Sequence, residues 1–349
     1  MRKAGSSVTT SEIISQLRLP LIVLVTFAHS YGAVSSDFSL LSGNIDGYEL
    51  LKLMVSQTLV KVVVPVFYIV SGYLFFANVS QWNVRVYRQK LLRRARTLLL
   101  PYIVWNLLMT IKLGTASWTT LWAYWTTAGV QTDWLGNQQL MTAPANMPLW
   151  FLRDLIVLSL LSPIVFVAVR YLGRWLLAVL TVWYLSGVCA FTPGLSAYAV
   201  MFFTLGAYCS INKLELTAVM RRIETAAYLL SAVLAVAMLL TWGTAVFSSL
   251  MLAFRLAGAV AVINLGRRLM EWTPRRIPTV VSRSSYFLYL AHYVFFMSFI
   301  DQAIFSVVGH SNNVALSIHY LLAPLLKAAI LIAVYAVGQM AVDRLRCHR

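Results

Sequence analysis

Residues 17–31 read LRLPLIVLVTFAHSY, an apolar run with an arginine at its start and a histidine near its end. Arg18 and His29 are eleven residues apart. At 100° per residue, this spacing returns both side chains to nearly the same face of a helix, about 16 Å apart along its axis. Ionisable groups inside a membrane span are costly and usually face a cavity or a partner. The stretch predicts a membrane-spanning helix with one functional face, although a satisfied interior histidine is the plainer alternative.

The composition of the whole chain is that of a membrane protein. Of its 349 residues, 60% are hydrophobic and 11% are charged, whereas soluble domains average about 25% charged residues. Allowing about 20 apolar residues per crossing, we predict an all-α integral membrane protein that forms a single domain over residues 1–349. The ten candidate transmembrane helices are residues 17–34, 53–77, 95–112, 148–169, 174–191, 197–211, 225–242, 246–265, 284–308 and 316–342.

The basic residues predict how these spans are oriented. Of the 28 Lys and Arg residues, 22 fall in the termini and in alternate connecting segments. Short basic segments stay in the cytoplasm, so both termini are expected there. The net charge of +17 is then a signal of topology and does not indicate a nucleic-acid partner. We expect a basic cytoplasmic loop at 78–96 and an external tryptophan-rich segment at 113–146, whose composition is typical of a segment lying on the membrane surface.

The loop at 78–96 ends in a dense group of cations, Arg85, Arg88, Lys90, Arg93, Arg94 and Arg96. Arg93 and Arg96 are three residues apart and would be neighbours on a helix. Guanidinium groups at this spacing suit a polyphosphate, because each can bind an anionic oxygen pair. The group indicates either a phosphate-bearing cytosolic ligand or a cluster that only sets topology.

Four further cations fall inside the predicted spans, where the acids are Asp154 and Asp301. The cations are Lys61, Arg153, Arg255 and Lys327. They outnumber their possible partners, so some lysines are neutral, some cations bind backbone carbonyls, or a cavity receives an anion. Arg153, beside Asp154, either ties two helices together or contacts a substrate.

Ser285, Tyr289 and His292 recur at four and three residues and make one polar stripe on a predicted helix. Such a stripe either lines a cavity or joins helices by hydrogen bonds.

Four segments together resemble a known family. They are Arg18-x10-His29, residues 64–74 (VPVFYIVSGYL), Arg93-x-x-Arg96 followed by Pro101-Tyr102, and residues 285–292 (SYFLYLAH). In this order, and on ten predicted spans, the chain resembles the membrane-bound acyltransferase family 3 of bacterial cell-surface O-acyltransferases. The family usually has Arg-Gly where this chain has Arg18-Leu19, followed by Pro20. Proline is tolerated in the first turn of a helix, so this departure does not remove the motif.

The resemblance implies a multi-pass protein of the bacterial cytoplasmic (inner) membrane, surrounded by membrane lipid, that uses acyl-CoA from the cytoplasmic side. It implies that the donor phosphates bind near Arg93, Arg94 and Arg96, and that the acyl group, presumed to be acetyl from acetyl-CoA, reaches a cavity containing His29. Arg18 is too far from His29 for a direct hydrogen bond, so we expect it either to bind the donor phosphates or to position the helix entry. The acceptor is then a hydroxyl of a cell-surface or lipid-linked glycan. No metal is implied, and the three widely spaced cysteines predict no metal-ligand cluster.

In this interpretation His29 is the general base, which takes the proton of the acceptor hydroxyl as its oxygen attacks the thioester. Arg153, Tyr73 or His292 could stabilise the oxyanion, with Asp154 as a further cavity contact. The sequence does not indicate an oligomeric state.

The alternative function is a membrane transporter or exporter of a polar or anionic solute. Embedded cations and His29 could form a proton relay in such a protein. Against it, the sequence shows no pair of matching halves with broken helices. We therefore favour the enzyme.

Overall fold

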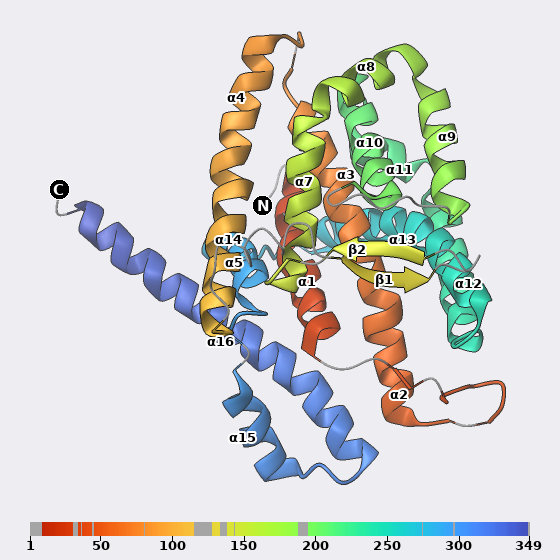
Figure 1. Ribbon diagram of the computed structural model, residues 1–349, viewed down its shortest axis with the longest axis vertical. Helices are drawn as coiled ribbons and strands as arrows, with labels where there is room; N and C mark the ends of the chain where they lie inside the picture. The colour runs from red at the N-terminus through yellow and green to blue at the C-terminus, as the bar shows by residue number, and fades with distance from the viewer. Residues whose placement is uncertain are drawn as a thin grey trace.

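A computed structural model describes residues 9–30, 34–35, 37–43, 45–79, 81–114, 128–132, 138–142, 144–187, 195–273, 275–295 and 297–347. Within these residues the regular secondary structure is helical apart from one antiparallel hairpin (Figure 1). The amino-terminal half contains α1 (Thr10–Ser30), α2 (Gly47–Lys52), η1 (Leu53–Thr58), η2 (Leu59–Val62), α3 (Val63–Phe76), α4 (Val84–Arg94), η3 (Ala95–Leu99), α5 (Leu100–Lys112), β1 (Ala128–Thr132), β2 (Gln138–Thr142), η4 (Met147–Leu149), α7 (Trp150–Leu160) and α8 (Ser162–Leu172).

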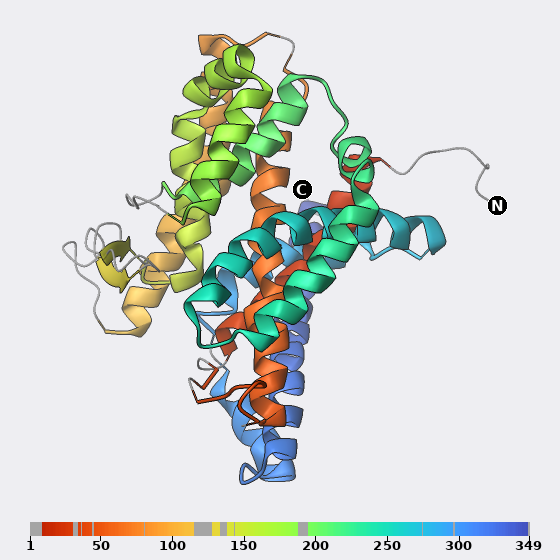
Figure 2. The same ribbon diagram turned by 90° about the vertical axis from the view of Figure 1, so that its right-hand side faces the viewer.

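The remaining helices follow without further strands in the described part of the chain. They are α9 (Arg174–Leu185), α10 (Ala197–Ile211), α11 (Leu216–Arg221), α12 (Glu224–Leu240), α13 (Ala245–Trp272), α14 (Thr279–Ala291), α15 (Ser298–Val308) and α16 (Asn313–Cys347). In Figures 1 and 2, α4 and α7 to α10 lie at one end of the molecule, and α2, α15 and the start of α16 lie at the other.

The apolar helices give the chain the architecture of a multi-pass membrane protein. Four helical segments are long and apolar enough to cross a membrane: Thr10–Ser30, Gly47–Phe76, Ala245–Trp272 and Asn313–Leu345. A fifth is added if Met147–Leu160 and Ser162–Leu172, which meet at a 65° bend, form one span. The other apolar helices are shorter, so the full set of ten spans and the cytoplasmic termini stay predictions.

Three expected elements differ from the structure, and one of them is the span 148–169, which is divided between α7 and α8 at the 65° bend. Residues 78–96 are not a loop throughout, because α4 begins at Val84 and continues through η3 into α5. The Asn83 side chain caps α4 by accepting from the Val86 N–H at 3.0 Å. The expected continuous span 284–308 is two helices, since α14 ends at Ala291 and α15 begins at Ser298.

Pro101 explains how the α4 to α5 helix is attached to α14. Proline has no N–H to give to the carbonyl four residues earlier. That carbonyl belongs to Thr97, and it accepts a hydrogen bond of 2.6 Å from the Tyr286 hydroxyl on α14. Pro101 therefore leaves the Thr97 carbonyl available to accept a hydrogen bond from α14.

The core is centred on a close crossing of α3 and α10. A Cβ added to Gly72 would lie 2.0 Å from the Phe203 carbonyl oxygen, and one added to Gly206 would lie 1.9 Å from that of Ile69. Only glycine allows two helix backbones to approach this closely. Tyr68 and Phe203 beside the crossing are fully buried.

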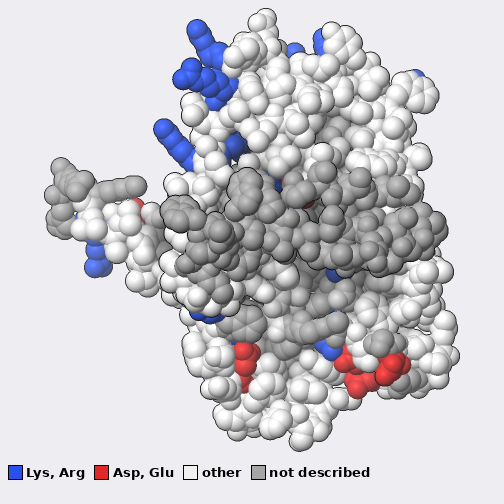
Figure 3. Space-filling view, in the orientation of Figure 1, with Lys and Arg blue, Asp and Glu red and all other residues white. Residues whose placement is uncertain are grey.

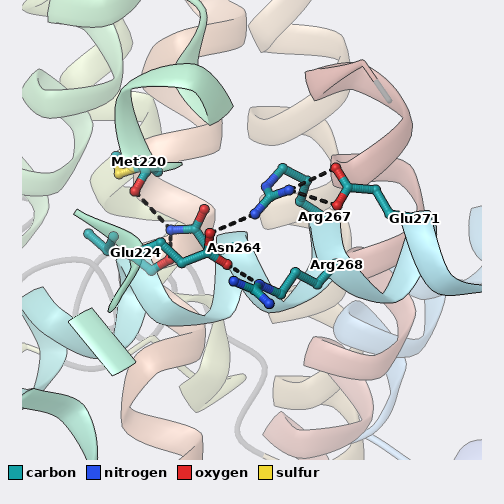
Figure 4. Close-up of polar contacts among 7 residues, drawn as sticks. Met220, Glu224, Asn264, Arg267, Arg268 and Glu271 are labelled. Atoms are coloured by element: carbon teal, nitrogen blue, oxygen red, sulfur yellow. Dashed lines mark hydrogen bonds and ion pairs between the residues drawn. The ribbon is translucent and has the colours of Figure 1, made fainter. Parts of the chain in front are cut away.

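Ion pairs join α12 to α13 at the predicted cytoplasmic side (Figure 4). Arg267 donates to Glu224 and to Glu271, each at 2.7 Å, and Arg268 also donates to Glu224. The Asn264 amide donates to the Met220 carbonyl at 2.9 Å. Arg267 and Arg268 are thus already paired with carboxylates.

The hairpin lies within the expected tryptophan-rich segment at 113–146. Its strands pair antiparallel, with Ala128 opposite Thr142 and Thr132 opposite Gln138. Trp118, Trp122, Trp125 and Trp134 lie outside the described residues, so the expected surface segment stays a prediction.

Candidate functional site

A cavity of about 1700 Å³ lies between α1, η2, α3, α4, α7, α10, α13 and α14. Arg18 and His29, both on α1, line it. Arg93, Arg94 and Arg96 line the same cavity. The structure therefore brings the two sequence motifs to one continuous space.

His29 lies in the last turn of α1, beside the carboxyl end of α14. The centroid of its ring is 5.5 Å from that of His292, at an interplanar angle of 45°. Tyr293 lies edge-on to His29 with centroids 6.0 Å apart. The polar stripe of α14 ends at its C-cap residue, His292, which lies directly beside the candidate base.

The contacts of His292 fix its tautomer. Its Nδ1 is 2.8 Å from the Tyr289 carbonyl oxygen and 3.2 Å from that of Leu288. Carbonyls only accept, so Nδ1 carries the hydrogen and Nε2 of the neutral ring is an acceptor. This Nε2 atom is buried and has no hydrogen-bond partner among the residues that the structure describes.

Where the cavity reaches the surface, it is lined by five cations, which we call the basic mouth: Lys90, Arg93, Arg94, Arg96 and Arg283. The Lys and Arg side chains that gather over the upper part of α4 in Figure 3 lie toward the start of this helix, whereas its cations in the basic mouth begin at Lys90. Arg93 and Arg96 are exposed, whereas the Arg94 guanidinium lies 5.3 Å above the Phe75 ring. Arg85 and Arg88, on the same helix, are not among the residues lining the cavity.

Arg153 and Asp154 also line the cavity, and both are buried. Arg153 Nε and Asp154 Oδ1 are 3.8 Å apart. Asp154 Oδ2 accepts hydrogen bonds from the Tyr68 hydroxyl at 3.1 Å and from Ser196 at 3.3 Å. Asp154 therefore ties α7 to α3 and α10 while it faces the cavity.

The remaining predicted positions fall into two groups. Ser285 and Tyr289 line the cavity, and the Tyr289 hydroxyl also donates to the Pro148 carbonyl at 2.6 Å. The stripe therefore both lines a cavity and joins helices. Tyr73 is not among the cavity-lining residues and lies near Thr10 and Leu216. The structure thus does not bring Tyr73 together with His29.

Three cavity residues were not assigned to the site from the sequence. Lys61 of η2 and Arg255 of α13 carry a recognisable signal, because each is a cation within an apolar span. Tyr198 of α10 carries no such signal, yet its ring lies 4.9 Å from the Arg255 guanidinium. No group of three or more His, Cys, Asp or Glu that could hold a metal occurs among the described residues.

Comparisons with known proteins agree with the family resemblance. Over 177 residues, or 48% of this chain, the sequence is 32% identical to the succinoglycan biosynthesis protein ExoH of Rhizobium meliloti (strain 1021). The alignment covers 45% of that protein, so the chain spans less than half the length of the curated relative that it matches. No solved structure matches the chain. A family model described as an acyltransferase domain matches residues 12–338. Because this match covers nearly the whole chain, the protein belongs to acyltransferase family 3.

Proposed function

We propose that the protein transfers an acyl group from cytoplasmic acyl-CoA to a hydroxyl of a cell-surface or lipid-linked glycan. The observation that supports this function best is the shared cavity, which is lined by the basic mouth and by His29. A donor bound through its phosphates at the mouth has a continuous path to the candidate base.

In this proposal Arg93, Arg94 and Arg96 bind the phosphates of coenzyme A, and Arg18 lines the path between them and His29. Arginine is suited to phosphates because its fork of donors can bind two oxygens at once. Pantetheine is a long thin arm that suits a thioester held away from its phosphates. On a regular helix, Arg18 and His29 are about 16 Å apart.

His29 then acts as the general base. Its imidazole accepts the proton of the acceptor hydroxyl while the hydroxyl oxygen bonds to the thioester carbonyl carbon. The carbon–sulfur bond breaks, and coenzyme A leaves as a thiol after it recovers the proton from the imidazolium. Arg153 lines the cavity and is our candidate to stabilise the intermediate oxyanion.

His292 positions His29 in this scheme. Its own ring is fixed through Nδ1 by two carbonyls of α14, which leaves Nε2 available beside His29. A group that fixes the orientation of a base reduces the reorganisation needed for proton transfer.

The proposed orientation places both termini in the cytoplasm of a bacterial cell, with ten spans in the inner membrane. His29 is then near the external end of α1, which suits an acceptor at the outer surface. The named role of ExoH in succinoglycan biosynthesis supports a polysaccharide acceptor. Acetyl is the acyl group that we expect from the family.

The test uses the full chain in proteoliposomes with acyl-CoA and a polysaccharide acceptor. Released thiol and the mass increment of the glycan are measured together. We expect His29→Ala to lose about a hundredfold or more of the rate, which is the size of a general-base contribution. His310→Ala is the matched control, because His310 is exposed and does not line the cavity. Full transfer by His29→Ala would overturn the base assignment.

A further inference from the structure

Lys61 is a cation within a predicted span, and the proposed transfer leaves it without a role. Its side chain is partly exposed and lines the cavity. Within the described part of the chain, the Lys61 ammonium makes no hydrogen bond or ion pair with protein. Arg153 differs, because its Nε lies 3.8 Å from Asp154 Oδ1. A cation that is embedded in an apolar span and has no protein partner indicates contact with a ligand or with water in the cavity.

Two stripes of side chains at helical spacing lead along the cavity to His29 and to Lys61. On α1 the stripe is Arg18, Ile22, Val25 and His29, and on η2 and α3 it is Lys61, Val64, Phe67 and Ser71. In each stripe, the residues between the two polar ends are apolar. Each wall therefore presents one ionisable side chain after an apolar track.

The first span and the segment that contains Lys61 run antiparallel. The Ser56 hydroxyl of η1 donates to the Phe27 carbonyl at 3.2 Å, near the end of α1. In the opposite direction along both segments, Ile14 of α1 and Val70 of α3 line one small cavity. The last turn of α1 and the η2 turn therefore lie at the same end of the large cavity.

His29 and Lys61 are the ionisable side chains that the two stripes bring to this end. They lie near enough to interact electrostatically. A thioester that reacts beside His29 presents its carbonyl oxygen, on which negative charge develops in the transition state. An ammonium has three N–H donors and no acceptor, and its flexible stem can direct them. Lys61 therefore has both the position and the chemistry to meet that oxygen.

We propose that the Lys61 ammonium donates a hydrogen bond to the thioester carbonyl oxygen and stabilises the oxyanion that forms there. This inference rests on the proposed acyl transfer and adds a second donor beside Arg153. As the acceptor oxygen bonds to the carbonyl carbon, the π electrons of the C=O bond move to its oxygen and the hydroxyl proton moves to His29. Lys61 keeps its protons throughout. The C=O bond then forms again as the carbon–sulfur bond breaks, and the thiolate takes the proton from the imidazolium.

The first test is the kinetics of Lys61→Met, which keeps an unbranched side chain and removes both the charge and the donors. The full chain is assayed in proteoliposomes with acyl-CoA and a polysaccharide acceptor. We expect kcat to fall about a hundredfold or more, the size of the loss of one oxyanion donor, with little change in the KM for acyl-CoA. Lys213→Met, at an exposed position, is the control. A wild-type kcat in Lys61→Met, or a loss confined to KM, would overturn the donor role.

The second test restores the charge chemically and does not depend on how well Lys61→Met folds. Lys61→Cys is made in a background with serine at Cys189, Cys209 and Cys347. One purified batch is divided between 2-bromoethylamine, which rebuilds an ammonium at nearly the length of lysine, and iodoacetamide, which adds a neutral amide. We expect only the first adduct to recover kcat, by about tenfold or more. Equal recovery by both adducts, or recovery by neither, would overturn the donor role.

The same assays keep this inference distinct from the proposed function. A wild-type protein that releases no thiol and adds no mass to the glycan would overturn the proposed transfer, and the donor role with it. A wild-type protein that transfers the acyl group, together with a Lys61→Met protein of equal kcat, would overturn the donor role alone.

Discussion

The rings of His29 and His292 face one another with centroids 5.5 Å apart, although they come from α1 and from the end of α14. His292 is held through Nδ1 by the carbonyls of Leu288 and Tyr289. A helix terminus therefore fixes the ring next to the proposed base. Because His292 is the first residue beyond α14, its contact with His29 lies at a break between two helices.

Replacing His292 by asparagine or glutamine tests its positioning role. The amide nitrogen of Asn can reproduce the Nδ1 bond to the helix carbonyls, whereas the longer Gln places an amide near the Nε2 position. We expect His292→Asn to lower kcat about tenfold with little change in donor KM, because proton transfer depends on orientation. The measurements are thiol release across pH and the thermal unfolding temperature. A purely structural His292 would give a normal kcat and pH profile in any His292→Asn protein that unfolds at the wild-type temperature.

The basic mouth should control donor affinity more than rate. We expect the double variant Arg93→Gln/Arg96→Gln to raise the KM for acyl-CoA about tenfold or more, with kcat nearly unchanged, since phosphate contacts are the same in ground and transition states. The control is Arg85→Gln/Arg88→Gln, which removes two charges from the same helix outside the cavity. Similar KM values for the two double variants would show that the cations act only through general charge.

The crossing of α3 and α10 should not tolerate side chains. A methyl group at Gly72 or Gly206 meets backbone at 2.0 or 1.9 Å, so each Gly→Ala change forces the helices apart. We expect a loss of about 3 kcal/mol in stability, at the upper end of ordinary overpacking effects. Gly338→Ala is the control, because nothing lies within 4 Å of its added Cβ. Thermal or denaturant unfolding in detergent measures both. Wild-type stability of Gly206→Ala would contradict the close crossing.

Cysteine labelling tests the predicted orientation. In a background with serine at Cys189, Cys209 and Cys347, we expect Asn312→Cys to react with an impermeant maleimide in intact cells. Arg85→Cys should react only after permeabilisation, because basic segments stay cytoplasmic. The reverse pattern would invert the topology, and labelling of both in intact cells would contradict the span count between them.

The sequence singled out several residues that the structure places along one cavity, and their roles stay predictions. Arg18, His29 and the arginines of α4 could be recognised because charge inside or beside an apolar run is rare. Tyr73 belongs to the motif at 64–74 but is not among the residues that line the cavity. Ser71 lines the cavity, and a residue two positions later points about 200° away on a helix.

The differences in the helices have local causes that composition does not show. The many cations at 78–96 led us to expect a loop. The Asn83 side chain caps a helix there, and residues 84–100 contain no Gly or Pro that would interrupt it. α14 ends at Ala291, and the side chain of the next residue, His292, bonds back to the Tyr289 carbonyl, an arrangement that a count of apolar residues cannot detect. The sequence showed Lys61 and Arg255 as cations inside apolar spans. It did not show that both line one cavity, because this depends on the packing of α13 against η2.

The placement of the basic mouth at the surface and of His29 deeper in the same cavity affects turnover in the proposed reaction. The arginines hold a part of the donor that the reaction does not change. Free coenzyme A keeps the same phosphates, so it competes with acyl-CoA for the same cations at comparable affinity. The rate in a cell then follows the ratio of acylated to free coenzyme A, and surface acylation becomes a readout of the metabolic state of the cytoplasm.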